Sequence, residues 1–75
     1  MDNLKTCQKQ FYDEKTTHQF KFKINDSIKI LKGTFNNIIG TVISLETIKP
    51  EPTYLIETST GKDIIMLESH IELFD

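Results

Sequence analysis

The segment from Asp26 to Val42, DSIKILKGTFNNIIGTV, restricts the fold of this chain more than any other. Ile28 and Ile30 alternate with polar neighbours, which is typical of a strand with one buried face. Gly33 then predicts a turn, and Gly40 stands in the β-rich run that follows a loop with an apolar tip. Two strands joined by a projecting loop are the layout of a small barrel that presents this loop for recognition.

Further short runs with a period of two predict more strands. In residues 19–24, Phe20, Phe22 and Ile24 share one face, so this run is expected to be a half-buried strand. Residues 39–48 are dense in β-branched side chains, which favours a strand over a helix. Three more strands are expected over residues 53–58, 63–66 and 71–74, with one helical turn over 67–70 before the last of them.

Prolines and glycines separate these runs. Pro50 and Pro52 remove two backbone donors, which predicts a loop or a sheet edge, and Gly61 can take a positive φ in a hairpin turn over residues 59–62. Short strands at close spacing without a long helix predict an all-β fold, and a closed five-stranded SH3-like barrel within residues 22–74 fits this length best. Its core is expected to include Ile28, Ile30, Val42, Ile56, Ile64 and Ile71.

Residues 1–18 are expected to form a short, partly flexible N-terminal arm before a barrel domain over residues 19–75. The start of the chain is polar, and Leu4, Phe11 and Tyr12 are the only large apolar side chains among residues 1–16. A helix over residues 4–12 would be marginal in isolation because it is so short. Two interpretations stay open: a disordered tail, or an arm that Phe11 and Tyr12 attach to the domain.

Size and composition limit the chain to one small domain. A protein of 75 residues has a marginal core, and its 37% apolar content suits a water-soluble domain. No apolar run approaches the roughly 20 residues of a membrane span, and the sequence MDNLKTCQKQ lacks the apolar segment of a signal peptide. Cys7 is the single cysteine, so an internal disulfide is excluded. A cytoplasmic protein without membrane insertion is therefore expected.

The charge distribution argues against strong nucleic-acid binding. The net charge is −2, and the chain contains no arginine, the side chain best suited to bidentate contacts with phosphate and guanine. Lysines gather in the first half of the chain. Those on the outward faces of the first strands could form a basic stripe that binds phosphates, or they could be solvated residues that keep a sheet edge from aggregating. The candidate nucleic-acid contacts are Lys21, Lys23, Lys29 and Lys32. Any such binding is expected to be weak.

Residues 26–42 resemble a KOW motif, the signature of one class of SH3-like barrels. The motif begins with an acidic residue at the head of a strand, here Asp26, and continues with alternating apolar positions and a turn glycine. Phe35 follows this glycine by two residues, and Gly40 precedes the strand that contains Val42. The chain is similar to the C-terminal domain of NusG-type transcription elongation factors over about residues 22–75. Gly61 falls at the last hairpin glycine of that domain, and Ile71 falls on its closing strand.

The resemblance implies a docking module that binds a ribosomal protein or a termination factor through loop tips. Carried over by position, the protein-binding residues are Phe35 and Ile38 in the first loop and Thr60, Gly61 and Lys62 in the last hairpin. Isoleucine 38 and threonine 60 replace aromatic residues of those domains, and lysine 62 replaces an arginine. KOW and SH3-like barrels also occur in ribosomal proteins and as small accessory subunits of enzyme complexes.

Two interpretations of Phe35 stay open. It is either an exposed anchor at an interface, where aromatic residues are enriched, or a lid folded over the open end of the barrel. Near the C-terminus, Asp63, Glu68 and Glu72 are expected to form a solvated face.

The sequence predicts no catalytic, metal or cofactor site. His18 and His70 match no zinc spacing, and Cys7 and His18 lie on or beside the arm, where a preorganised nucleophile and base are not expected. Phosphate loops, dinucleotide fingerprints and serine elbows are missing from the sequence.

The leading hypothesis is a non-catalytic module that binds a protein partner in a transcription- or translation-type assembly. The alternative is a small structural or regulatory subunit of a larger enzyme or membrane-associated complex, for example a photosynthetic one. The oligomeric state stays open.

Overall fold

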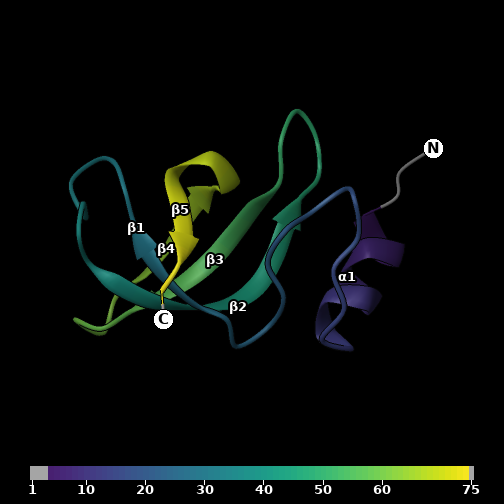
Figure 1. Ribbon diagram of the computed structural model, residues 1–75, viewed down its shortest axis with the longest axis horizontal. Helices are drawn as coiled ribbons and strands as arrows, with labels where there is room; N and C mark the ends of the chain where they lie inside the picture. Colours follow the sequence, from purple (N-terminus) through teal and green to yellow (C-terminus); the bar gives the residue numbers. More distant parts are fainter. Residues whose placement is uncertain (1–3, 75) are drawn as a thin grey trace.

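A computed structural model describes residues 4–74, which form a five-stranded sheet with one short helix beside it (Figure 1). The elements are α1 (Leu4–Tyr12), β1 (Ser27–Ile30), β2 (Ile39–Thr47), β3 (Thr53–Thr58), β4 (Asp63–Leu67), the 3₁₀ turn η1 (Glu68–His70) and β5 (Ile71–Leu73). All neighbouring strands are antiparallel, in the order β4-β3-β2-β1-β5. The sheet is open, because β4 and β5 each pair with a single neighbour.

The strands expected after residue 26 are confirmed, as is the helical turn before the last strand. β2 is the longest strand, as its β-branched side chains predict, and the loop with Pro50 and Pro52 separates it from β3. Gly33 and Gly61 have φ values of 90° and 88°, a region that costs glycine little. The mainly β character of the prediction is therefore correct. The closed barrel is not found, because within residues 4–74 the five antiparallel strands form one open sheet in which β4 and β5 do not pair with each other.

The strand expected over residues 19–24 is wrong, although its side chains alternate as expected. Phe20 and Phe22 are buried and Ile24 is half-buried, but the only bridge of this segment joins Thr17 to Phe20. Its backbone donors do not meet a neighbouring strand. The N–H groups of residues 21 and 22 donate to Tyr54 Oη at 3.3 Å each, and the Ile24 N–H donates to the Phe11 carbonyl of α1 at 3.4 Å.

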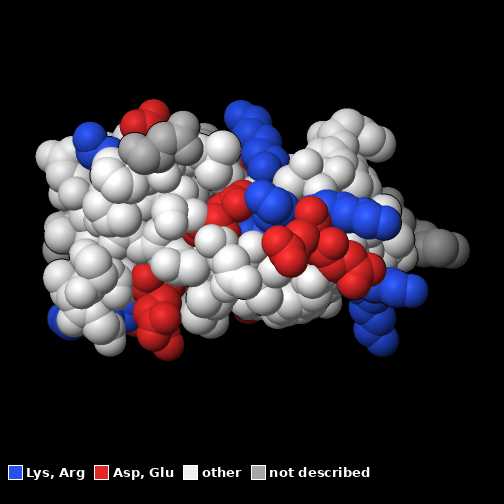
Figure 2. All heavy atoms as spheres, turned by 60° about the horizontal axis from the view of Figure 1, so that its bottom comes forward, with Lys and Arg blue, Asp and Glu red and all other residues white. Residues whose placement is uncertain are grey.

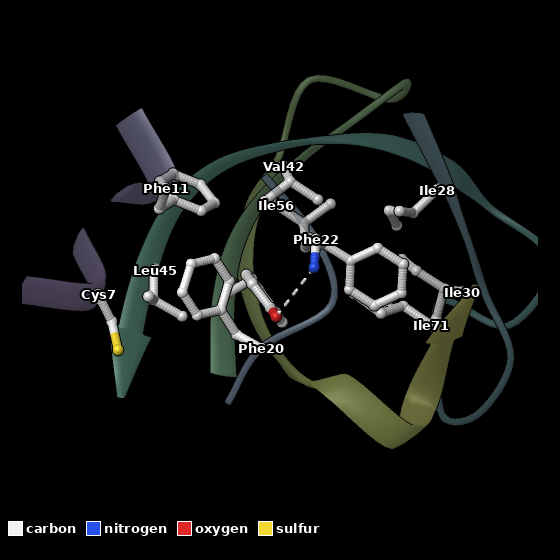
Figure 3. Close-up of a cluster of buried hydrophobic side chains, with 11 residues drawn as sticks. Cys7, Phe11, Phe20, Phe22, Ile28, Ile30, Val42, Leu45, Ile56 and Ile71 are labelled. Atoms are coloured by element: carbon white, nitrogen blue, oxygen red, sulfur yellow. Dashed lines mark hydrogen bonds between the residues drawn. The ribbon is translucent and has the colours of Figure 1, made fainter. Parts of the chain in front are cut away.

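The core lies between the sheet, the segment over residues 20–24 and α1 (Figure 3). Of the predicted core residues only Ile64 is half-buried, and the others are buried. The ring of Phe22 meets that of Tyr54 edge to face, with centroids 5.5 Å apart. The core also contains the aromatic side chains of Phe11, Phe20, Phe22 and Tyr54. The alternation in residues 19–24 had placed Phe20 and Phe22 on a buried face, and their burial is confirmed.

Helix α1 attaches the N-terminal segment to the sheet. Cys7 and Phe11, four residues apart on one helix face, are 1% and 0% exposed and belong to the same core as the strands. The Gln8 side chain donates from Nε2 to the Leu45 carbonyl of β2 at 2.8 Å. Of the two interpretations of the arm, the structure has the attached one, with Phe11 rather than the half-exposed Tyr12 as the anchor. Within residues 4–74, no helix has the length and apolar character needed to cross a membrane.

Candidate docking site

The loop between β1 and β2 is closed at its base by backbone hydrogen bonds. The Asn37 N–H donates to the Ile30 carbonyl at 2.7 Å, and the Ile30 N–H donates to the Ile38 carbonyl at 2.9 Å. Asn37 has a φ of 72°, a left-handed conformation that asparagine tolerates better than most residues. A further turn bond runs from the Asn36 N–H to the Gly33 carbonyl at 3.1 Å. The loop therefore holds its tip in a defined position.

Phe35 and Ile38 face two environments at once. Both side chains are half-buried and pack against the hydrophobic core, and the rest of their surface meets solvent. Phe35 is thus neither a free tip nor a fully buried lid. An apolar side chain that the core supports and solvent still reaches is suited to contact a partner without losing its position.

The turn between β3 and β4 is organised by Thr58, which is 3% exposed. Its Oγ1 accepts a hydrogen bond from the Lys62 N–H at 3.0 Å, and its own N–H donates to the Lys62 carbonyl at 2.7 Å. Thr60, Gly61 and Lys62 are exposed beyond this closure. The turn presents them on a rigid base.

The structure brings the loop and the turn to the same end of the sheet (Figure 1). The Ser59 N–H, at the start of the turn, donates to the carbonyl of Ile39, where the loop ends, at 2.8 Å. A shallow depression of about 170 Å³ lies between them. Its lining consists of Ser27, Ile39, Gly40, Thr41, Glu57, Thr58 and Ser59. We call this end, with Phe35, Ile38, residues 60–62 and the depression, the loop-end surface.

The face seen in Figure 2 separates charged from uncharged surface. Acidic and basic side chains crowd together over the half that holds α1, whereas the half that holds the loop and the turn is mostly uncharged, with charges at its margins. A surface depleted of charge is the usual composition of the centre of a protein interface.

The predicted lysines do not form a basic stripe of free charges. Lys23 pairs with Asp26, with 2.8 Å between Nζ and Oδ1, and this hydrogen bond raises the pKa of the lysine. On the sheet, Lys29 is directly opposite Glu72 in the register of β1 and β5. Opposite charges that face one another across a strand pair stabilise the sheet, and they also reduce the positive potential that could attract a phosphate. Lys21 and Lys32 are exposed.

Sequence reasoning missed a polar junction at Glu68, which was expected on a solvated face. Glu68 Oε2 accepts hydrogen bonds from Tyr54 Oη at 2.6 Å and from the Lys21 N–H at 2.8 Å. Burial, and then the bond to Glu68, raises the pKa of Tyr54. The signal was available, because an inward-facing tyrosine on a strand requires a partner for its hydroxyl. The junction holds the segment over residues 20–24 on the sheet.

Comparison with models of known protein families and with characterised proteins gives no match for this chain. Within residues 4–74, no group of three or more His, Cys, Asp or Glu side chains is placed to hold a metal ion.

Proposed function

We propose that this protein is a non-catalytic docking module of the KOW-type, SH3-like class, and that its loop-end surface binds a protein partner. One observation carries the proposal: the loop with Phe35 and the turn with Gly61, twenty-some residues apart in the sequence, meet at one end of the sheet, where few side chains are charged. Gly61 also lies in the last hairpin and Ile71 on the last strand, which are the places that the KOW resemblance implies. A transcription- or translation-type assembly in the cytoplasm is the proposed setting.

A protein partner suits this surface better than nucleic acid does. Its side chains are apolar or uncharged apart from Lys62 and Glu57, which carry opposite charges. Phosphate binding requires a clustered positive field, and the lysines with acidic neighbours contribute little to one.

A second proposal is that the protein is a small structural or regulatory subunit held permanently in a larger complex. Large apolar side chains are exposed on several elements, which suits a partner that covers a broad surface. They are Tyr12, Leu31, Ile65, Leu73 and Phe74.

Affinity capture from the native cell, with Phe35→Ala and Leu73→Ala side by side, tests the docking proposal. Loss of Phe35 should weaken capture at least about tenfold, since a hot-spot aromatic contributes about 2 kcal/mol or more. Its stability should fall by less than the roughly 3–5 kcal/mol of a fully buried phenylalanine, because the side chain is half-buried. Leu73→Ala is the matched control, with an exposed apolar side chain on β5, far from the loop in sequence.

Four outcomes distinguish the two proposals. Capture lost only with Phe35→Ala supports docking through the loop-end surface. Capture weakened equally by both variants supports the broadly covered subunit. A folded Phe35→Ala variant that captures its partner at full strength overturns the proposed surface, and an unfolded one shows that Phe35 acts as a core lid.

A further inference from the structure

β4 is an edge strand whose outer side is open. It pairs with β3 through five register positions, from Thr53 opposite Leu67 to Glu57 opposite Asp63, and with no other strand. Ile65, at its centre, is 59% exposed, the highest value among the large apolar side chains that are exposed. An exposed edge with an apolar residue at its centre is a template for pairing with another strand.

The hydrogen bonds at the two ends of β4 define which backbone groups point outward. Thr58 N–H donates to the Lys62 carbonyl, and Glu68 N–H donates to the Pro52 carbonyl. In an antiparallel pair, positions that exchange hydrogen bonds alternate with positions that do not. Ile64 and Met66 therefore direct their N–H and C=O groups toward β3. Asp63, Ile65 and Leu67 direct theirs away from it, where no described residue of the protein accepts or donates a bond to them.

The other open edges of the sheet are either covered or very short, whereas the β4 edge is neither. Beyond Val42, β2 has no strand on the side of β1, and α1 lies there, with Gln8 donating to the Leu45 carbonyl. β5 is only three residues long. Proteins commonly guard an edge with charged side chains, proline, a bulge or a covering element. In the strand DIIML the only charge is Asp63 at its first position, and the remaining residues are apolar.

We propose that the β4 edge pairs with the β4 edge of a second copy of this chain, antiparallel and centred on Ile65. This register places Ile65 opposite Ile65 of the second copy and Asp63 opposite Leu67, so all outward-directed groups find partners. It also brings Lys62 of each copy toward Glu68 of the other, whereas the register that sets Asp63 opposite Asp63 opposes like charges. The self-complementary charge pattern selects a second copy over an unrelated strand.

The association is weak, because an edge of five residues buries less surface than a stable interface requires. It forms at high protein concentration or where a larger assembly brings two copies together. Of the loop-end surface it uses only Lys62 and neither Phe35 nor Ile38, so loss of capture in Phe35→Ala and loss of association in Ile65→Lys are separate outcomes.

Amide hydrogen exchange of the unmodified protein tests the pairing directly. Between about 10 μM and about 1 mM, the range expected for a small interface, the amides of Asp63, Ile65 and Leu67 should become protected. The amides of Ile64 and Met66, which already bond to β3, should be protected throughout. Exchange at Ile65 that does not depend on concentration overturns the proposal, as does protection that rises equally at all five positions.

Sedimentation equilibrium with two matched variants locates the interface. The average mass of the unmodified protein should rise toward that of a dimer over this concentration range. Ile65→Lys, which adds an edge charge of the kind that blocks pairing, should remain monomeric, and Leu73→Lys, a similarly exposed position on the β5 edge, should still associate. Association that survives Ile65→Lys, or that only Leu73→Lys removes, overturns the β4 interface.

Discussion

Tyr54 is the side chain on which two parts of the chain meet. It is fully buried, its ring contacts those of Phe11 and Phe22, and its hydroxyl bonds to Glu68 and to the backbone of residues 21 and 22. The apolar ring fills the core while the hydroxyl supplies the acceptor that an unpaired segment would otherwise lack. One residue therefore accounts for much of the attachment of residues 20–24.

The raised pKa of Tyr54 predicts a loss of stability at high pH. The unfolded chain releases this proton near the usual value of 10, whereas the folded protein retains it because burial disfavours the phenolate. The unfolded state then binds fewer protons, so the contribution of Tyr54 to the free energy of unfolding is fully present below about pH 10 and is lost as pH rises above it. Urea melts from pH 8 to 11 measure this slope. Tyr54→Phe should flatten this slope, and an equal slope in the variant would contradict the assignment to Tyr54.

Gly40 is a position where a side chain does not fit. A Cβ built there would lie 2.5 Å from Ile56 Cγ2 and 3.0 Å from the Glu57 carbonyl oxygen, both on the neighbouring strand. Gly40→Ala should therefore destabilise the protein by about 1–3 kcal/mol through overpacking, and Gly40→Val by more. Thr41→Ala, the adjacent half-buried position, should cost less than about 1 kcal/mol. Equal melting temperatures of Gly40→Ala and the unmodified protein would contradict this close approach.

At the scale of elements, the strands from β1 to β5 could be predicted because each carries its own pattern. Alternating apolar residues, glycine turns and the prolines after β2 are local signals. The segment over residues 19–24 has the same alternation, and yet its hydrogen-bond partners are the side chains of Tyr54 and Glu68, which lie far away in sequence. A pattern of side chains indicates which face is buried, and it does not indicate where the backbone donors go.

Helix α1 could be suspected from the sequence but not established by it. Its stability comes from contacts that no local pattern contains, with Phe11 against Phe20 and Tyr54 and Gln8 on the β2 carbonyl. The candidate site shows the same division. The KOW resemblance predicted the loop and the turn as binding elements, and this stays a prediction. The bond that joins Ser59 to Ile39 and the depression beside it required the structure.

The contribution of α1 can be measured by truncating its anchor. Phe11→Ala should cost about 3–5 kcal/mol, because the ring is fully buried, and a domain of this size has little stability to spare. Tyr12→Ala is the control. The Tyr12 ring is half-exposed, so its removal should cost much less stability than removal of the Phe11 ring. Chemical denaturation compares the two. A small loss of stability in Phe11→Ala, no greater than that in Tyr12→Ala, would mean that the sheet is stable without the helix.

At the scale of the whole molecule, charge decides which partners can approach. Nine lysines oppose eleven acidic residues, without arginine, and two of the four candidate lysines have an acidic residue beside or opposite them. The half of the visible face that holds the loop and the turn is mostly uncharged (Figure 2). A weak overall field of negative sign favours a protein partner that contacts the loop-end surface at short range over a polyanion attracted from a distance.

Duplex DNA should accordingly bind weakly and only through phosphates. Affinity then falls steeply between about 50 mM and about 200 mM salt and does not depend on base sequence, because released counterions supply the free energy. Fluorescence anisotropy with two duplexes of unrelated sequence at both salt concentrations measures this. Lys21→Gln with Lys32→Gln removes the exposed lysines of the candidate set and should abolish the residual binding, whereas Lys23→Gln, whose lysine already faces Asp26, should change it little. A tight complex with one defined duplex that persists at the higher salt concentration would overturn the assignment, since the field of this molecule cannot produce it.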